Sequence, residues 1–422
     1  MTLRLEPRDE RMLSGAEEEA VRTAMRIVVS LAEIAGAERL VDISSAHVDG
    51  CLYQGQVSLD FAERLVEGGA GVRVPTTLNV GGLDLLHPDL YRGDPDRARG
   101  ARRLMDLYVE MGCHPTWTCA PYQVDARPAF GEHVAWAESN AIVFANSVLG
   151  ARTDRYGDFI DICAAITGRA PYAGLHVTES RRGQALFRLE GIPGGLLEED
   201  VFYPVLGHLI GAETGMLVPV IDGLPEGVTE DRLKALGAAA ASSGSVGLFH
   251  ALGVTPEAPT LHDALQGGEP ERVIDVTPGL VARARDSLTT VADGPLRAVS
   301  VGTPHFSLAE FERLVALLDG VRVADGVGFY VSTGRSVLAR AESRGWLEAC
   351  ERAGVTIVVD TCTYVTPILR ADGGVVMTNS GKWAYYAPGN LGVDVVFGSL
   401  EECVRSAAEG KVWRDRELWT GI

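Results

Sequence analysis

The sequence predicts a mixed α/β protein built around a largely parallel sheet, and three observations support this. Five apolar runs typical of buried strands recur late in the chain, at Leu296–Val301, Val327–Val331, Val355–Val359, Val375–Met377 and Val393–Phe397. Helical patterns fall between several of them, at residues 308–318, 335–352 and 399–409. This alternation is typical of parallel sheets, whose strands are joined by crossover helices. The chain has 422 residues, 46% of them hydrophobic, which is enough for a sizeable core.

The earlier part of the chain follows a less regular pattern. We expect an amphipathic helix over residues 15–35, a short strand at Arg39–Ile43 and an extended segment at Val72–Val80. Further helices are predicted at Leu59–Glu67, Asp96–Met111, Gly131–Leu149 and Asp158–Thr167. Residues 172–260 mix short strands with apolar helices. We place a junction between two lobes within 260–295, which gives an N-terminal lobe of residues 1–265 and a C-terminal lobe of residues 266–422.

Charge and hydropathy narrow the classes of function. The formal net charge is −19, which disfavours nucleic acid and anionic membrane surfaces as partners. No segment has about 18 uninterrupted apolar residues, and the N-terminus does not resemble a secretory signal. We therefore expect a cytoplasmic enzyme without membrane segments.

Several common site motifs are missing from the sequence. The seven cysteines form no CxxC pair, so a zinc ribbon or a thioredoxin motif is excluded. No GxGxxG follows a strand, and GxxxxGK[ST], GxSxG and HExxH do not occur. Nucleotide binding, a nucleophile elbow and a zincin site are therefore disfavoured.

Polar side chains gather directly after the late apolar runs. Ligands of parallel sheets bind at the carboxyl ends of the strands, so these positions are candidate site residues. They are Thr303, His305, Ser332, Cys362 and Lys382. Ser and Thr that cap the following helices would give a similar pattern. Lys382, between Gly381 and Trp383, would either clamp a carboxylate or lie on the surface.

Three segments of the N-terminal lobe carry further candidates. Ser44, Ser45, His47 and Cys51 follow a predicted strand within eight residues. Cys119 stands before Ala120-Pro121, where its thiol would project from a turn and bind a metal. The segment from Glu138 to Arg152 places Asn and Ser inside an apolar helix, where they need partners from the core or from a ligand.

These segments together resemble the aconitase X family, the dehydratase branch of the aconitase superfamily. The matching stretches run through nearly the whole chain. They include SSAHVDGCLYQG from Ser44, VPTTLN from Val74, TCAPYQ from Thr118, GEHVAWAESNAIVFANSVLGART from Gly131, ICAAITGRAP from Ile162, GSVGLFHALGVTPE from Gly244, TPHFSL from Thr303, DTC from Asp360 and TNSGKWAYY from Thr378.

The resemblance implies aconitase-like α/β/α layers and an iron–sulfur cluster that assists removal of water from a small hydroxy acid. The combination of Gly50-Cys51-Leu52-Tyr53, TCAPYQ and ESNAIVFANSVLGART looks more like the bacterial type that dehydrates cis-3-hydroxy-L-proline. The runner-up is the archaeal type that dehydrates mevalonate 5-phosphate. Two further possibilities are a divergent specialised-pathway lyase or isomerase with a single metal, and an inactive acid-binding regulatory subunit.

The resemblance also suggests roles for individual residues. Where the phosphate type has Cys-Pro-His, this chain has Thr303-Pro304-His305, so Cys51 is the expected replacement ligand beside Cys119 and Cys362. A [2Fe-2S] cluster is then expected, or else mononuclear iron or another divalent metal. The expected catalytic residues are Ser45, His47, His305 and Lys382. The expected substrate-binding residues are Ser44, Asn79, Tyr122, Glu138, Ser139, Asn146, Ser147, Arg152, Thr303 and Ser332.

Members of this family also have a swivelling domain, fused or as a separate small subunit, with a Gly-Ser-Ser-Ser-type motif. No such segment occurs in the 422 residues. The chain is therefore expected to be the large subunit of an enzyme with a small swivel-domain subunit, which would supply the catalytic base. If it does not, His305 or a hydroxyl activated by Lys382 is the local candidate for the base.

Overall fold

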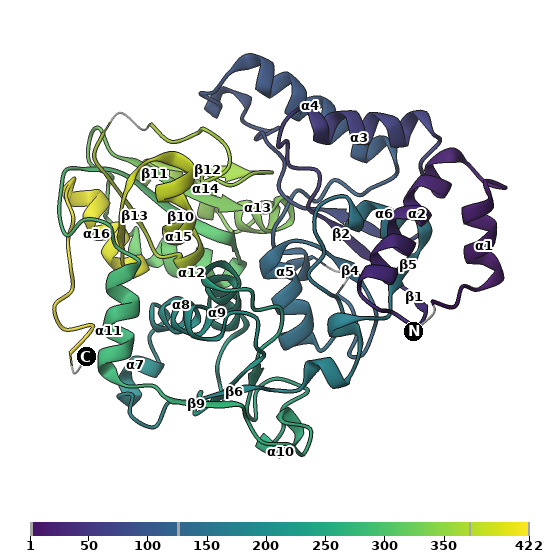
Figure 1. Cartoon of the computed structure of the whole chain (residues 1–422). Coiled ribbons are helices and arrows are strands. Elements are labelled where there is room, and N and C mark those ends of the chain that lie inside the picture. Colours follow the sequence, from purple (N-terminus) through teal and green to yellow (C-terminus); the bar gives the residue numbers. More distant parts are fainter. Residues whose placement is uncertain (1–2, 125–126, 371–372, 421–422) are drawn as a thin grey trace. The chain divides into compact units, whose positions relative to one another are not determined.

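The computed structural model describes residues 3–124, 127–370 and 373–420. It divides into two compact units (Figure 1). Unit 1 comprises Met1–Leu83 and Gly93–Arg182, and unit 2 comprises Asp84–Arg92 and Gly183–Ile422. The units thus divide near residue 182, whereas the sequence suggested a lobe junction within 260–295, which stays a prediction. Unit 2 extends across this junction, because α8 Phe202–Thr214 and α9 Glu230–Ser243 pack against each other and against α15 Gly381–Leu391 of the same unit.

Unit 1 contains a three-stranded parallel sheet in the order β3-β2-β4. Its strands are short: β2 Ala46–Val48, β3 Thr76–Leu78 and β4 Ala135–Trp136. Two more strands, β1 Leu40–Asp42 and β5 Arg169–Pro171, form an antiparallel pair. A short strand has little pairing of its own, so buried side chains on the flanking helices must supply much of the stability.

The helices of unit 1 pack in pairs beside these strands. They are α1 Pro7–Ser14, α2 Glu19–Ile34, α3 Gln56–Glu67, α4 Pro95–Glu110, α5 Ser139–Phe144 and α6 Ile160–Thr167. Helix α6 packs on β2 and α2, and α3 packs on α4. The helix expected over residues 15–35 begins only at Glu19, because Gly15 has a left-handed conformation (φ 77°) that ends α1.

The helix predicted over Gly131–Leu149 is only partly present. Residues Ala135–Trp136 instead pair with β2 as the strand β4. The helix begins at Ser139, where Glu138 caps it, and its last turn, Ala145–Leu149, is a π-helix. The apolar residues near 134–136 fit either a helix or a strand, and the open edge of β2 decides in favour of the strand.

Unit 2 is built on a five-stranded sheet in the order β12-β11-β10-β13-β14, with every neighbouring pair parallel. The strands are β10 Leu296–Phe306, β11 Gly328–Thr333, β12 Val355–Val359, β13 Val375–Thr378 and β14 Asp394–Phe397. All five coincide with the apolar runs of the sequence. The predicted parallel sheet is confirmed.

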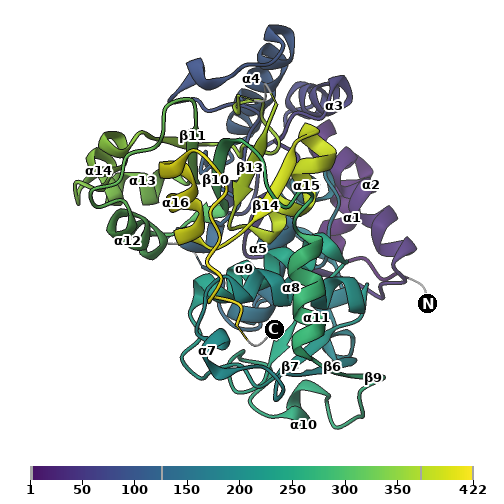
Figure 2. The ribbon, with the colours of Figure 1, turned by 90° about the vertical axis from the view of Figure 1, so that its left-hand side faces the viewer.

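Helices cover both faces of this sheet (Figure 2). Helices α12 Leu308–Leu317, α13 Arg335–Glu342, α14 Trp346–Ala353 and α16 Leu400–Glu409 form one layer. Helix α15 Gly381–Leu391 packs on β13 and β14, and it also packs against α8 Phe202–Thr214 and α9 Glu230–Ser243. The single helix predicted over 335–352 is split, because Gly345 adopts a left-handed conformation (φ 71°) between α13 and α14.

A second parallel sheet in unit 2 has the order β8-β7-β6-β9. Its strands are β6 Ala185–Arg188, β7 Pro219–Asp222, β8 His250–Ala251 and β9 Arg272–Asp275, and the short helices α7 Gly194–Leu197 and α10 Leu261–Ala264 and helix α11 Pro278–Ser287 complete the unit. Across the part of the chain that the structure describes, no helix is both long and apolar enough to cross a membrane.

Candidate functional site

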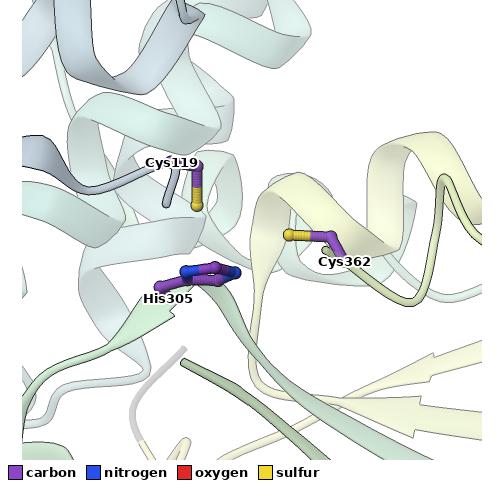
Figure 3. Close-up of side chains that lie close together, drawn as sticks. All are labelled: Cys119, His305 and Cys362. Atoms are coloured by element: carbon purple, nitrogen blue, oxygen red, sulfur yellow. The ribbon is translucent and has the colours of Figure 1, made fainter. Parts of the chain in front are cut away.

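The carboxyl end of β10 places two metal-binding side chains together in unit 2. His305 is the last but one residue of β10, and Cys362 lies in the turn that follows β12. Their nearest ligand atoms lie within 4.8 Å of each other, and both side chains are buried. Figure 3 draws both side chains and labels as well Cys119, a thiol of unit 1. A thiol and an imidazole are the donors that iron, zinc and iron–sulfur clusters prefer.

The turn that carries Cys362 is held by an extensive hydrogen-bond network. The hydroxyls of Thr361 and Thr366 lie 2.5 Å apart. Thr363 shares a hydrogen bond of 2.6 Å with Ser300 and accepts one of 3.0 Å from the indole of Trp383. Because every anchor is buried, the thiol has little freedom to move. A preorganised ligand of this kind favours metal binding.

Asp360, directly before this turn, has a strained backbone that an ion pair holds in place. Its φ of 63° is unusual for a residue other than glycine. The guanidinium of Arg335 donates to both carboxylate oxygens of Asp360, at 2.6 and 2.7 Å. This bidentate pair fixes the point at which the chain leaves β12 for Cys362.

A cavity of about 220 Å³ opens beside the same edge of the sheet in unit 2. Thr303 and Lys382, both predicted site residues, line it and are buried. The hydroxyl of Thr303 has no hydrogen-bond partner among the described residues, and neither has that of Ser332 in β11. The other polar or charged residues of its wall are Glu199, Asp200, Asp231, Arg232, Lys234, Glu310, Arg313, Asn379, Ser380, Ser399, Glu401 and Asp415.

Behind His305, a buried lysine ties the end of β10 to two helices. The ammonium of Lys234 in α9 donates to the main-chain carbonyl of His305 at 3.3 Å. It also pairs with Asp231, at 2.9 Å, and with Glu310 of α12. Ser307, the N-cap of α12, donates to Asp231 at 2.6 Å. These hydrogen bonds and ion pairs connect α9 and α12 to the end of β10 and thereby hold the backbone of His305 in place.

In unit 1, two rows of side chains cross the same face of sheet β3-β2-β4. Thr77, His47 and Trp136 are register partners and form the inner row. The hydrogen-bond ladder continues past the strand ends, from Asn79 to Val48 and from Ala137 to His47. Since side chains alternate along a strand, the outer row on this face comprises Asn79, Asp49 and Glu138.

The chemistry of the two rows differs. In the inner row, Nδ1 of His47 shares a hydrogen bond of 2.8 Å with Thr77, and burial lowers the pKa of His47 to about 4 despite the charge of Glu138. In the outer row, burial and the carboxylates of Asp158 and Glu138 raise the pKa of Asp49 to about 7. The unit thus holds a neutral imidazole beneath a row of oxygen acceptors.

The segment of Cys119 is anchored within unit 1 by Asn140. The amide of Asn140 donates to the carbonyl of Cys119 at 3.0 Å and to the hydroxyl of Tyr122 at 2.8 Å. Tyr122 stacks on Phe144, with ring centroids 3.6 Å apart. Tyr122 therefore serves the packing of the turn, and a role in binding substrate stays a prediction.

Other predicted site residues of unit 1 have protein partners. Asn146 exchanges hydrogen bonds with the backbone of Thr153 and accepts one from Arg181. Arg152 donates to the carbonyl of His176 and to Thr178, and Ser44 donates to the carbonyl of His133. Ser139 donates to Glu138, which caps α5. Ser45 is half-buried directly before β2, and Ser147 is buried in the π-helical turn.

Cys51, the expected third thiolate, belongs to unit 1. Its thiol is buried against the carbonyls of Val48 and Asn79, each 3.4 Å away, and burial raises its pKa far above the usual value. These contacts suit a neutral thiol. Its metal role stays a prediction, while His305 stands beside Cys362 instead.

Three residues with evident roles in these sites were not among the predicted ones: Asp49, Asn140 and Lys234. A signal for Asp49 existed, because it stands two residues after His47 and so shares its face of the strand. Lys234 carried a weaker one, as one of only three lysines in the chain. Asn140 offered none, since its partner lies 21 residues away.

Three family models match the chain in succession. They are described as the aconitase X first domain (residues 2–179), second domain (183–286) and third domain (296–409). The boundary between the first two agrees with the division between units 1 and 2.

Curated relatives and a solved structure agree with these matches. A cis-3-hydroxy-L-proline dehydratase of Pseudomonas aeruginosa is 43% identical over 97% of this chain and 70% of its own length. One from Hypocrea jecorina is 41% identical over 97% and 69%. The phosphomevalonate dehydratase large subunit of Methanothermobacter thermautotrophicus is 38% identical over 95% and 98%.

The solved structure is that of Thermococcus kodakaraensis aconitase X in its holo-form. It matches with a TM-score of 0.86 and 33% identity, and the match covers 96% of this chain and all of that one. Domain models, relatives and structure all agree, and the chain therefore belongs to the aconitase X family.

Proposed function

We propose that this protein is a hydro-lyase that removes water from cis-3-hydroxy-L-proline. The observation that carries a dehydratase is the buried His305–Cys362 pair at the carboxyl edge of β10, with a cavity beside that edge lined by Thr303 and Lys382. The choice of substrate follows from the two relatives above 40% identity, which both bear this activity in their names.

The donor atoms present fit the iron that the family implies. His305 and Cys362 supply one nitrogen and one sulfur, and Cys119, the other buried thiol drawn in Figure 3, is the proposed third ligand. Two thiolates and an imidazole suit a [2Fe-2S] cluster or a single iron ion better than an all-thiolate cluster. Bound there, the iron would act as the Lewis acid for the departing hydroxyl group.

The side chains of unit 2 have the chemistry to hold a carboxylate. Lys382 lies in the first turn of α15, where the helix dipole favours negative charge. The unsatisfied hydroxyl of Thr303 is a donor in the same cavity. We propose that these two groups orient the substrate carboxylate, so that the hydrogen on the neighbouring carbon and the hydroxyl group are presented for elimination.

The base that takes this hydrogen is proposed to come from a small swivel-domain subunit. Support comes from the phosphomevalonate dehydratases, whose large subunits this chain matches over 98% of their length in the Methanothermobacter case. Loss of one proton to the base and of hydroxide, protonated to water, leaves a carbon–carbon double bond, so the step needs no oxidant.

Two measurements test the proposal. Anaerobically purified protein is expected to contain about two irons and two acid-labile sulfides per chain, with thiolate-to-iron absorption bands. With the candidate small subunit added, it is expected to convert cis-3-hydroxy-L-proline to an unsaturated imino acid. Protein with neither sulfide nor iron would refute the metal site, and protein that carries iron but leaves hydroxyproline unchanged would refute the substrate.

The second candidate is phosphomevalonate dehydration. It is favoured by the full-length match to the archaeal large subunits. Turnover of mevalonate 5-phosphate in the same assay, without turnover of hydroxyproline, would establish it. The single-metal lyase and the inactive acid-binding subunit predict neither turnover, and differ from each other in whether iron is bound.

A further inference from the structure

The outer row of unit 1, Asn79–Asp49–Glu138, contains a buried acceptor without a matching donor. We propose that this row binds the protonated nitrogen of an amino-acid substrate and so selects an amino acid over a phosphorylated hydroxy acid. The inference rests on the proposed function, because it assigns the substrate class that the row would recognise.

The register of the sheet brings these three side chains together. Asn79 follows β3, Asp49 follows β2 and Glu138 follows β4, each one or two residues beyond the last register partner of its strand. The amide nitrogen of Asn79 donates to Oδ1 of Asp49, which confirms that the two side chains meet. Ligands of parallel sheets bind at this edge.

One acceptor in the row is buried and unsatisfied. Oδ1 of Asn79 has no hydrogen-bond partner among the described residues, and the side chain is only 3% exposed. It belongs to the same amide whose nitrogen contacts Asp49, so it lies beside that carboxylate. Nε2 of His47, from the row beneath, also lacks a partner. A buried polar atom left unsatisfied costs stability, unless a ligand completes it.

The charge of the surroundings specifies the kind of ligand. Asp49 is partly exposed, and the carboxylates of Glu138, Asp158 and Asp161 all act on it. Neither Asp49 nor Asp161 forms an ion pair within the described ranges, while Asp161 accepts from the backbone N–H groups of Asp49 and Gly50. A phosphate would be repelled here, whereas a cation would be stabilised.

The protonated ring nitrogen of a proline matches the two acceptors of this row, the Asp49 carboxylate and Oδ1 of Asn79. It carries one positive charge and two N–H groups, which would donate to the Asp49 carboxylate and to Oδ1 of Asn79. Charge-assisted hydrogen bonds of this kind are the strong ones. A hydroxy acid without nitrogen would leave Oδ1 of Asn79 unsatisfied and the charge of Asp49 unpaired, and this penalty is the proposed source of discrimination.

Two small probes isolate the nitrogen without requiring turnover. L-proline and tetrahydrofuran-2-carboxylate share the five-membered ring and the carboxylate, and differ in the ring nitrogen. Their affinities are measured by isothermal titration calorimetry at pH 8 on the iron-loaded protein with its small subunit, for the wild type and for Asp49→Asn. Asp60→Asn in α3 is the matched control, because it removes an exposed carboxylate of the same unit.

The wild type and Asp60→Asn are expected to bind L-proline at least tenfold more tightly than the oxygen analogue. Asp49→Asn is expected to bind both probes equally. If Asp49→Asn does not fold, as judged by circular dichroism, Asn79→Ala is expected to reduce the preference severalfold. Equal binding of both probes by the wild type, no binding of L-proline, or a preference that survives these substitutions would overturn the inference.

This outcome is separable from the fate of the proposed function. A preference for L-proline that depends on Asp49, in an enzyme that leaves cis-3-hydroxy-L-proline unchanged, would keep the nitrogen site and refute the reaction. If Asp49→Asn turns over hydroxyproline and binds L-proline with the affinity of the wild type, the proposed reaction is kept and the nitrogen site is refuted.

Discussion

At the carboxyl edge of sheet β3-β2-β4 in unit 1, the clustered side chains are oxygen acceptors, whereas the carboxyl edge of the β10 sheet in unit 2 carries a thiol, an imidazole, an ammonium and hydroxyl donors. The first edge has Asn79, Asp49 and Glu138 in one row. The second has His305 with Cys362, and Thr303 with Lys382 beside them. In both sheets the candidate site lies at the carboxyl ends of parallel strands. The topology therefore determines where a ligand would bind, and the side chains at that edge determine which ligand.

The two edges also differ in how they are supported. The His305 edge is held from behind by buried charges, with Lys234 between Asp231 and Glu310. Among the described residues, the Asp49 carboxylate accepts a hydrogen bond from the amide of Asn79, while its own backbone N–H donates to Asp161. A metal ligand needs a fixed position, whereas a group that receives a cationic substrate needs its charge uncompensated until the substrate arrives. Four changes test this contrast, from the largest expected effect to the smallest.

The largest effect is expected from Cys362→Ser. Loss of the thiolate should remove the iron and lower kcat/KM at least about 1,000-fold, equivalent to about 4 kcal/mol of transition-state stabilisation. Metal analysis and steady-state kinetics measure it. Cys350→Ala, in the core of the same unit, is the control and should keep its iron. Full iron content in Cys362→Ser would remove this edge from the metal site.

Next in size is Lys234→Met, which tests the support of His305. It leaves two partly buried carboxylates without their cation, so the free energy of unfolding should fall by about 3 kcal/mol. Lys411→Met is the matched control, because that lysine is exposed and its pairing with Glu409 is worth little. Urea unfolding compares the two variants. Equal stability would show that the buried charges contribute nothing to holding the edge.

The sequence predicted the β10 sheet well and the unit 1 sheet less well, for a physical reason. Strands such as β13, Val375–Thr378, are buried at every position and begin with a continuous apolar run. Strand β4 has two residues, and only pairing with His47 and its neighbours makes it a strand. Partly apolar segments of that length carry no periodicity that separates strand from helix.

The candidate site shows the same limit. Cys362, His305, Thr303 and Lys382 were predicted because each follows a recognisable strand or precedes a helix. The place of His305 beside Cys362 depends on the pairing of β10 with β11 and of β11 with β12, which the spacing of residues in the sequence does not encode. Cys51 was expected as a ligand because Thr303 stands where the phosphate type of the family has a cysteine, and that expectation stays a prediction; its thiol contacts backbone carbonyls.

A smaller effect is expected from pH, through His176 of unit 1. Burial, together with His133 and Arg181, lowers the pKa of His176 to about 3, against 6.5 for the unfolded chain. Between these values the unfolded chain binds the extra proton, so stability falls as the pH drops below 6.5. At pH 5 the loss is about 2 kcal/mol.

The comparison of two variants isolates this contribution. His176→Asn should flatten the dependence of the unfolding free energy on pH between 7 and 5, while His114→Asn, an exposed histidine of the same unit, should keep the slope of the wild type. Urea unfolding at each pH provides the measurement. An unchanged slope in His176→Asn would assign the acid sensitivity to other groups, of which His47 is the first candidate.

The smallest effect tests how unit 1 holds its own thiol. Asn140→Ala removes the two hydrogen bonds that anchor the segment of Cys119, at an expected cost of about 1.5 kcal/mol. The more informative readout is the rate at which a thiol reagent modifies Cys119, measured by peptide mass spectrometry on metal-free protein. Because the anchored turn must open before the buried thiol reacts, the rate should rise about tenfold. Cys163 in α6 of the same protein serves as the internal control, and its rate should stay unchanged. Equal acceleration of both thiols would mean that the whole unit has loosened, whereas an effect confined to Cys119 would show that its segment is fixed locally, as the turn of Cys362 is fixed in unit 2.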